Sequence, residues 1–324
     1  MIIVKAPMRV SFAGGGSDLP SYLIHEAFGK TLTTTINKFV YVTVNKSSSE
    51  RYRLVYSAIE ECVTPDEISH SILRQLLKRH TPKEPIELFS IADLPARGTG
   101  LGASSAFCLA AVAALTKYNS QETDNKFLAS EASHIEMKLC GNSSGFQDQY
   151  ASALGGLAVN TFSANGLHAT QDLISEGLVA GDILEWLNGH IVFVRVDGAR
   201  DSNSILKTID YKNSKIVSLQ REIAEMVDEF TEALIKKDFL LMGDLMDRNW
   251  KLKKTISPQT TSHDIDALYI KGKGCGALGG KLLGAGGSGY LLFIVTNSED
   301  FLVTMNLQDS GIRITGEKLE ILEV

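Results

Sequence analysis

Hydrophobic and polar positions in the first part of the chain follow the pattern of β-strands. Residues 1–12, 31–46 and 86–92 are rich in β-branched, aromatic and aliphatic side chains, and they predict three strands. A further buried strand is expected over 190–196. The run Ala-Gly-Gly-Gly-Ser-Asp at 13–18 has the composition of a turn. The chain is therefore expected to begin with a β-rich unit interrupted by this turn.

Apolar residues at helical spacing predict helices between and after these strands. The predicted helices cover 68–78, 105–117, 125–140, 214–237 and 239–253. In the fourth of them, the positions expected to face inward are Ile216, Leu219, Ile223, Val227, Phe230 and Leu234. Strands over 281–283 and 290–295, then a last helix and strand, are expected at the end. Because strands and helices do not alternate regularly, this order favours an α+β fold over repeated βαβ units.

The length of 324 residues suits two domains. A polar stretch containing glycine, at about 170–182, is the expected boundary between them. We therefore predict an N-terminal domain over 1–175 and a C-terminal domain over 176–324.

Composition limits the class of protein. With 44% hydrophobic and 22% charged residues, the chain is typical of a globular protein. The net charge of −6 argues against a general nucleic-acid binder, which needs a basic face. No apolar run approaches the roughly 20 residues that span a bilayer, and no secretory signal follows Met1. The four cysteines form no Cys-x-x-Cys pair, so we expect reduced thiols in a cytoplasmic protein.

The most informative chemical signal is the run Arg-Gly-Thr-Gly-Leu-Gly-Ala-Ser-Ser at 97–105, directly before an apolar, helix-prone segment. Glycines let backbone N–H groups approach an anion, and the two serines suit a helix start, so the run outlines a phosphate cradle. The candidate phosphate-binding residues are Arg97, Gly98, Thr99, Gly100, Leu101, Gly102, Ala103, Ser104 and Ser105. The run is neither a Walker A sequence nor a Rossmann fingerprint, and a bare loop of this kind is equally compatible with a tight connection.

A second candidate lies in the glycine- and serine-rich turn 141–149, which contains Asp148. An acid in such a turn often caps a helix or forms an Asx turn. A buried carboxylate could instead accept a proton from a substrate hydroxyl. Glu131 and Glu136 precede this turn, near the apolar stripe of a predicted helix. Helix glutamates are usually exposed, but either carboxylate could also hold Mg²⁺.

Two further segments have a structural and a functional interpretation. Arg9 precedes the turn, and a surface or salt-bridge arginine is its default interpretation. Asp18 could cap the turn, or it could accept hydrogen bonds from sugar hydroxyls. The run 284–289 contains four glycines between two predicted strands. It could be a flexible hairpin, although so many glycines indicate a close approach of the backbone to another group.

Taken together and in this order, these segments resemble the motifs of the GHMP kinases, the superfamily of galactokinase, homoserine kinase, mevalonate kinase and phosphomevalonate kinase. The matching runs are 5–18, 94–106 and 281–289, together with the turn at Asp148 and Gln149. The resemblance covers nearly the whole chain. It implies an ATP-dependent kinase with an N-terminal domain like ribosomal protein S5 domain 2, a ferredoxin-like C-terminal domain and a substrate cleft between them.

The resemblance also assigns roles. Asp148 matches the catalytic aspartate, and Arg9 matches the basic residue that pairs with it. Ser105 and Glu136 match the hydroxyl and carboxylate on Mg²⁺, with Glu131 as the alternative carboxylate if the helix register is shifted. The 98–105 run would surround the ATP phosphates. The residues expected at the sugar are Gly15, Gly16, Ser17, Asp18 and Arg200.

Within the superfamily, the run 12–20 most resembles the bacterial D-glycero-D-manno-heptose 7-phosphate kinases, whereas galactokinases carry Glu-His at the positions of Gly15 and Gly16. This resemblance implies phosphorylation of the anomeric C1 hydroxyl to give the 1,7-bisphosphate, on the route to nucleotide-activated heptose. The substrate's own phosphate would need cationic partners. The candidates are Arg97, Lys30, Arg200 and Lys207.

Two alternatives stay open. The chain could be another sugar 1-kinase, of the galactokinase, fucokinase or N-acetylhexosamine kinase type. It could also be a non-catalytic sensor of a sugar and ATP, although the joint presence of Asp148, Arg9, Ser105 and Glu136 favours an enzyme. The expected partner is a small sugar phosphate, with no nucleic-acid or membrane partner, and a homodimer is compatible with the resemblance.

Overall fold

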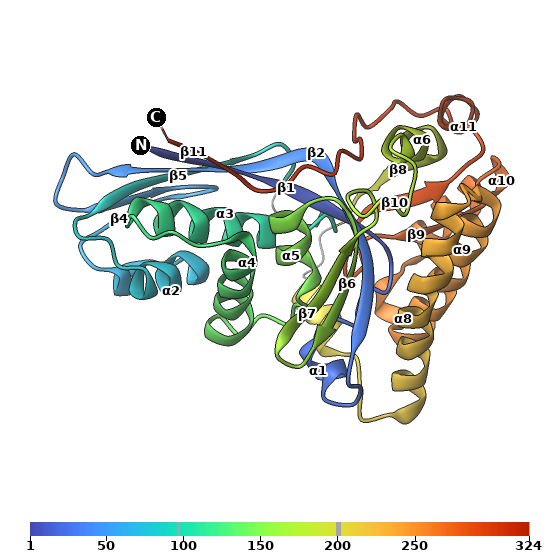
Figure 1. The fold of residues 1–324 in the computed structure, drawn as a ribbon, viewed down its shortest axis with the longest axis horizontal. Helices are drawn as coiled ribbons and strands as arrows, with labels where there is room; N and C mark the ends of the chain where they lie inside the picture. Colours follow the sequence, from blue (N-terminus) through green and yellow to red (C-terminus); the bar gives the residue numbers. More distant parts are fainter. Residues whose placement is uncertain (96–97, 199–201, 324) are drawn as a thin grey trace.

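The computed structural model describes residues 1–95, 98–198 and 202–323. Its strands form two separate sheets, each accompanied by helices (Figure 1). The mixed α and β architecture predicted from the sequence is thereby confirmed. Most predicted elements are present with ends that differ by a few residues, as is usual for element boundaries.

The first sheet is built around the long strand β2 (Gly29–Lys46). Three strands pair with β2: β1 (Ile2–Ala13), β5 (Ile86–Ala92) and β6 (Leu157–Ser163). Four shorter strands extend the sheet: β3 (Tyr52–Val55), β4 (Ile59–Cys62), β7 (Gly166–Asp172) and β11 (Glu320–Glu323). All these pairings are antiparallel except that between β3 and β5. From Ala6 onward β1 is buried on both faces, so its side chains lie inside the molecule.

Helices cover one face of this sheet. They are α2 (Ser71–Arg79), α3 (Ala103–Tyr118), α4 (Asn125–Ser133), a π-helix (His134–Leu139) and α5 (Gln147–Leu154). Helix α3 packs against β1 and β2 and is buried nearly all round, as its uniformly apolar sequence requires. The short elements α1 (Pro20–Leu23) and a 3₁₀ turn (Pro65–Glu67) lie in connections. This packing places the N-terminus of α3 beside the middle of β1.

The second sheet contains β8 (Ile191–Val196), β10 (Gly289–Ile294) and β9 (Gly279–Leu282), all antiparallel. Its helices are α6 (Ile183–His190), α7 (Ser202–Lys207), α8 (Ser214–Ile235), α9 (Phe239–Ile256), α10 (His263–Gly274) and α11 (Ser298–Met305), with a 3₁₀ turn at Pro258–Thr260. A separate hydrophobic cluster surrounds the fully buried Trp250. Helix α8 also contacts β1 and β2, and so joins the two halves. No helix in the described part of the chain is long and apolar enough to cross a membrane.

The end of the chain returns to the first sheet. Strand β11 pairs with β1, and Ile314 forms a bridge with Ile36 of β2. Figure 1 shows both termini at the same end of the molecule. The first sheet therefore contains a segment from beyond residue 176, while the division into 1–175 and 176–324 stays a prediction.

The structure corrects several predicted elements. The polar stretch expected to be a domain boundary, about 170–182, begins within β7, and the predicted helix 125–140 continues from residue 134 as a π-helix. Helix α10 was missed because Gly272 and Gly274 are weak helix formers. Gly272 has a packing reason, since a Cβ there would lie 2.5 Å from the Phe293 ring.

The inward face of α8 also differs from the prediction. Ile216 and Leu219 are only partly buried, whereas Val217 and Gln220 are buried. The four other predicted positions, from Ile223 to Leu234, are buried as expected. The polar residue Gln220 thus occupies an inward position, where its side chain forms hydrogen bonds with Gly15 and Tyr211.

The two glycine-rich loops pack against each other. A Cβ on Gly284 would lie 2.5 Å from the Gly100 Cα, and one on Gly100 would lie 2.5 Å from the Leu283 oxygen. Gly289 meets the first loop as well, because its Cβ would lie 2.5 Å from the Thr99 oxygen. The 284–289 run is therefore a close backbone contact between the two halves of the molecule.

We expect Gly284→Ala to destabilise the protein more than Gly177→Ala, which serves as a matched control. Both glycines have φ +69°, so alanine costs about 1–2 kcal/mol of backbone strain at either position. A Cβ on Gly177 meets nothing within 4 Å, whereas one on Gly284 must separate the two loops. Urea unfolding of both variants measures the difference, and equal losses would contradict the loop contact.

Candidate active site

Arg9 and Asp148 form a bidentate ion pair between β1 and the first turn of α5. The Arg9 Nε donates to Asp148 Oδ1 at 2.7 Å, and Nη2 donates to Oδ2 at 2.6 Å. The remaining guanidinium nitrogen, Nη1, donates to the Gly100 oxygen at 2.6 Å. Arg9 is only 5% exposed, so of its two default interpretations the surface arginine is wrong and the salt-bridge arginine is confirmed. The pair links the two residues that the resemblance brings together and fixes them to the glycine loop.

Asp18 lies beside this pair in a fully buried position, 1% exposed. Its carboxylate accepts hydrogen bonds from Gly16 N at 3.0 Å, Gln147 N at 2.9 Å and Gln147 Nε2 at 3.2 Å. Burial raises the pKa of Asp18 to about 6, and the nearby negative charge of Asp148 acts in the same direction. A Cβ on Gly145 would lie 1.9 Å from Asp18 Oδ2, so this turn needs glycine to approach the carboxylate.

The other residues expected at the sugar belong to the turn before Asp18. The Ser17 hydroxyl donates within the fold, to the Gly14 and Lys30 oxygens, both at 2.8 Å. Gly16 contributes its backbone N–H to Asp18. A Cβ on Gly15 would make only ordinary contacts, 3.5 Å from Gln147 Nε2.

Sequence reasoning missed two residues that support this turn from the second half. Gln220 of α8 donates to the Gly15 oxygen at 3.2 Å and accepts from the Tyr211 hydroxyl at 3.2 Å. A Cβ on Gly16 would lie 2.8 Å from Gln220 Oε1. The only signal in the sequence was a glutamine next to an apolar stripe, which normally indicates an exposed position.

The phosphate-cradle residues surround the start of α3. Gly102 is the N-cap, with φ +76° and no side-chain cap, so no side chain at this position competes for the first-turn N–H groups. A Cβ on Gly102 would lie 3.1 Å from Arg9 Cγ, which places the helix start against the ion pair. Gly98, Thr99 and Leu101 continue the loop, and Leu101 also accepts from the backbone N–H of Arg9 at 2.9 Å. Ala103 and Ser105 are buried and Ser104 is exposed, while Arg97 lies outside the described residues.

Glu136, 3% exposed, lies beside the start of α3. It accepts hydrogen bonds from Ser104 Oγ at 3.1 Å and Gln149 Nε2 at 2.6 Å, and from Ser105. Burial raises the pKa of Glu136. Glu131 instead pairs with Arg79 and with His80 Nε2, the latter at 2.9 Å. Although burial acts to raise it, the pKa of Glu131 is lowered overall by these hydrogen bonds.

The residues around Glu136 fit Mg²⁺. The carboxylate and the two serine hydroxyls are hard oxygen donors, which this ion prefers. The buried Gln149 Oε1 has no hydrogen-bond partner in the structure. Among the described residues, no group of three or more His, Cys, Asp or Glu could hold a metal. A magnesium ion here would therefore need phosphate oxygens and water to complete its shell.

The candidates for binding the substrate's own phosphate receive little support. Lys30 is paired with Asp228 at 2.8 Å, and Lys207 is exposed at the end of α7. Arg97 and Arg200 lie outside the described residues. Sequence reasoning missed two other lysines near Arg9, Lys253 and Lys281, and burial lowers the pKa of both.

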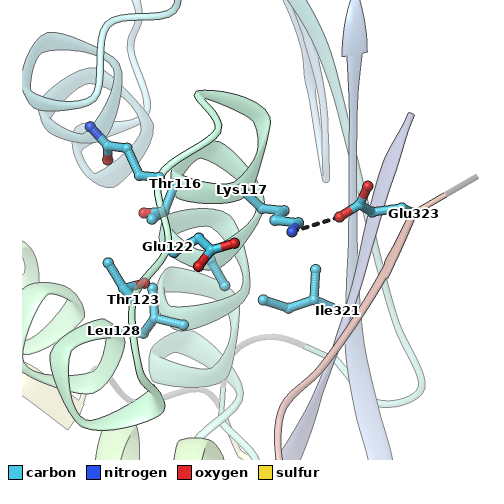
Figure 2. A pocket seen from close by; sticks show the side chains of 9 residues that line it. Thr116, Lys117, Glu122, Thr123, Leu128, Ile321 and Glu323 are labelled. Carbon is cyan, nitrogen blue, oxygen red and sulfur yellow. Dashed lines mark ion pairs between the residues drawn. The ribbon is translucent and has the colours of Figure 1, made fainter.

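Two cavities lie away from these residues. The first, about 300 Å³, is between α3, the segment 121–123 and β11, and Figure 2 shows the ion pair of Lys117 and Glu323 at its edge, 2.6 Å long. The second, about 400 Å³, is lined by 46–50 and 84–85. No candidate site residue lines either cavity.

Comparison with known proteins identifies the family. The model of the GHMP kinases N terminal domain matches residues 68–156, and that of the GHMP kinases C terminal domain matches residues 230–301. The chain belongs to the GHMP kinase family. It is an ATP-dependent phosphotransferase with the N- and C-terminal domains of these kinases.

Individual relatives are distant. The chain is 25% identical to the D-glycero-alpha-D-manno-heptose 7-phosphate kinase of Campylobacter jejuni, over 93% of this chain and 91% of that protein. It is 23% identical to the bifunctional fucokinase/GDP-fucose pyrophosphorylase of Arabidopsis thaliana, over 91% of this chain and 30% of that protein. A crystal structure of a D-glycero-D-manno-heptose 1-phosphate kinase from Bacteroides thetaiotaomicron superposes with a TM-score of 0.79 at 22% identity, covering 100% and 99% of the two chains. This last similarity shows the shared fold.

We expect the effect of Asp18→Asn on stability to depend on pH. Because the pKa of Asp18 is about 6 in the folded protein and about 4 when unfolded, the native state binds more protons in this window. Stability from this group therefore falls as pH rises from 4 to 7, by about 2–3 kcal/mol. Asparagine does not titrate, so the variant should gain stability relative to the wild type over the same range.

Urea unfolding at several pH values measures this difference. Asp264→Asn is the control, because it makes the same substitution at a side chain that is 96% exposed. If the stability difference between Asp18→Asn and the wild type does not change with pH either, the pKa of Asp18 is not raised by burial.

Proposed function

We propose that this kinase phosphorylates the anomeric C1 hydroxyl of D-glycero-D-manno-heptose 7-phosphate to give the 1,7-bisphosphate, in the synthesis of nucleotide-activated heptose. The observation that carries the proposal is the Arg9–Asp148 ion pair, which lies between the buried Asp18 and the uncapped start of α3. This arrangement suits a sugar hydroxyl on one side and nucleotide phosphates on the other.

Asp148 would orient the acceptor hydroxyl and accept its proton. A carboxylate has about four lone-pair positions, and Arg9 takes one on each oxygen, so each oxygen keeps another for the acceptor. An anomeric hydroxyl is more acidic than an ordinary alcohol, so a modest base suffices. Arg9 would offset the negative charge that develops as the phosphoryl group passes to the acceptor. Positioning and electrostatics would then supply most of the catalysis.

The choice of heptose rests on two observations. The run 12–20 resembles heptose 7-phosphate kinases, and the Campylobacter relative carries that activity in its name. Gly15 and Gly16 also have no side chains where galactokinases carry Glu-His, which suits a larger acceptor. The similarity to the Arabidopsis fucokinase supports a second candidate, a 1-kinase for a free deoxyhexose.

The test is an ADP-release screen over free hexoses, hexosamines, fucose, heptose and sugar phosphates including heptose 7-phosphate, followed by NMR of the product. We expect the highest kcat/KM with heptose 7-phosphate and phosphate on C1. Asp148→Asn should lower kcat by at least about a thousandfold and leave ATP affinity largely unchanged, since it removes the proton acceptor.

Four results would contradict the proposal. Phosphate on any carbon other than C1 would exclude the anomeric reaction. A higher kcat/KM with fucose would favour the second candidate. Ligand binding without ADP release for every sugar would favour a sensor, and full activity of Asp148→Asn would remove Asp148 from the mechanism.

We also propose that Mg²⁺ binds between Glu136, Ser105 and the ATP phosphates. Glu136→Gln removes the carboxylate and should raise the Mg²⁺ concentration needed for half-maximal activity about tenfold or more. Glu131→Gln is the matched control, a buried glutamate of the same helical run. It should lower stability by breaking the contacts with Arg79 and His80, with no change in the Mg²⁺ requirement. The same Mg²⁺ requirement in both variants would contradict the assignment.

A further inference from the structure

Two lysines of the C-terminal half lie near the candidate site and have no role in the proposed chemistry. Lys253 lies on α9 and is partly buried, and Lys281 lies on β9 and is 5% exposed. Both are close enough to Arg9 for its positive charge to act on them. Lysines are rarely buried without a partner of opposite charge, so this position needs an explanation.

Neither lysine pairs with a carboxylate in the part of the chain that the structure describes. Lys253 Nζ donates to two backbone oxygens, of Leu282 at 3.0 Å and Gly284 at 2.5 Å, which carry no formal charge. Lys281 Nζ makes no hydrogen bond or ion pair in the part of the chain that the structure describes, and no described carboxylate pairs with Lys253. Asp148, the acid of this region, is already held by Arg9.

Electrostatics agrees with this geometry. Burial, together with the charge of Arg9, lowers the pKa of Lys253 to about 7. Burial also lowers the pKa of Lys281, with added repulsion from Lys253 and Arg9. Three cationic side chains therefore lie together with one carboxylate among them. Such an excess of positive charge is unfavourable in the free protein and favourable once an anion binds.

The lysines lie at the junction of the two glycine loops. Lys253 holds the Gly284 oxygen, Arg9 holds the Gly100 oxygen, and the backbones of Gly100 and Gly284 are in contact. The anion site is therefore next to the loop that leads into α3 and next to Asp148. A phosphate at this junction would be within the reacting region of the kinase.

We propose that Lys253 and Lys281 form an anion site at this junction that binds a phosphate dianion of the reactants. The proposal rests on the proposed function for its location next to the reacting groups. Two groups have this chemistry, the terminal phosphate of ATP and the phosphate that the acceptor itself carries. Lys253 would contact the phosphate, and Lys281 would supply a second positive charge behind it.

The experiment compares Lys253→Met and Lys281→Met with the wild type in thermal stability and in calorimetric binding of ATP, ADP, heptose and heptose 7-phosphate. Methionine keeps the length of the side chain and removes the charge. For an anion site, we expect the free variants to be at least as stable as the wild type, and their affinity for a phosphorylated ligand to fall about tenfold or more. Lys254→Met is the control, because the neighbouring Lys254 pairs with Asp266 at 3.0 Å and should not affect binding.

The ligands distinguish the two sources of phosphate. A loss for ATP but not for ADP identifies the terminal phosphate, and a loss for heptose 7-phosphate but not for heptose identifies the acceptor's phosphate. Unchanged affinity for all four ligands, with lower stability of the free variants, would overturn the proposal and leave Lys253 as a support of the loop. If the wild type does not bind heptose 7-phosphate, the proposed substrate is wrong, and the comparison of ATP with ADP still decides on the anion site.

Discussion

The ion pair of Arg9 and Asp148 is the contact on which the candidate site depends. A guanidinium that is 5% exposed is tolerated only with a charged partner in good geometry, and the two parallel hydrogen bonds supply it. The pair connects three segments that are distant in sequence: the middle of β1, the start of α5 and the Gly100 loop. Because Gly102 lies against the Arg9 stem, the start of α3 is fixed by the same contact. Arg9, Asp148 and the phosphate-binding loop are thus positioned together.

A second constraint is that the C-terminal half completes this arrangement. Gly284 contacts Gly100, Lys253 binds the Gly284 oxygen, and Gln220 binds the Gly15 oxygen. Both glycine-rich segments of the N-terminal half, the turn 13–18 and the loop 98–102, are therefore held from the other half. Sites require such support because loops by themselves do not hold catalytic groups to within the precision that chemistry needs. The return of the chain end to β1 strengthens the same connection.

The sequence predicted what depends on local pattern and missed what depends on distant contacts. Strand β5 and the cores of α8 and α9 follow clear periodicity, and the phosphate loop follows from its glycines and from the helix behind it. Gln220 was missed because its partner is 205 residues away in the chain. Helix α10 was missed because it contains two weak helix formers, Gly272 and Gly274, of which Gly272 packs against Phe293. The choice between Glu131 and Glu136 depended on a π-helix, in which hydrogen bonds run from i to i+5 and change which side chains share a face.

The charges of the site are divided between the two halves in a way that favours a bound reactant over the free protein. The N-terminal half supplies two carboxylates, the buried Asp18 and the partly buried Asp148. The C-terminal half supplies two lysines, the buried Lys281 and the partly buried Lys253. Burial acts against ionisation on both sides, since it raises the pKa of Asp18 and lowers that of both lysines. No arrangement of these residues alone relieves both effects, because Arg9 already occupies Asp148 and repels the lysines. The proposed sugar phosphate would relieve both, because its hydroxyl groups would donate hydrogen bonds to the carboxylates and a phosphate would pair with the ammonium groups. Burying these groups lowers the stability of the free protein. In this proposal, the ligand would return that free energy as binding affinity, and it would do so only if it carries a phosphate. The buried charges would thereby favour the reactants of phosphoryl transfer over other ligands.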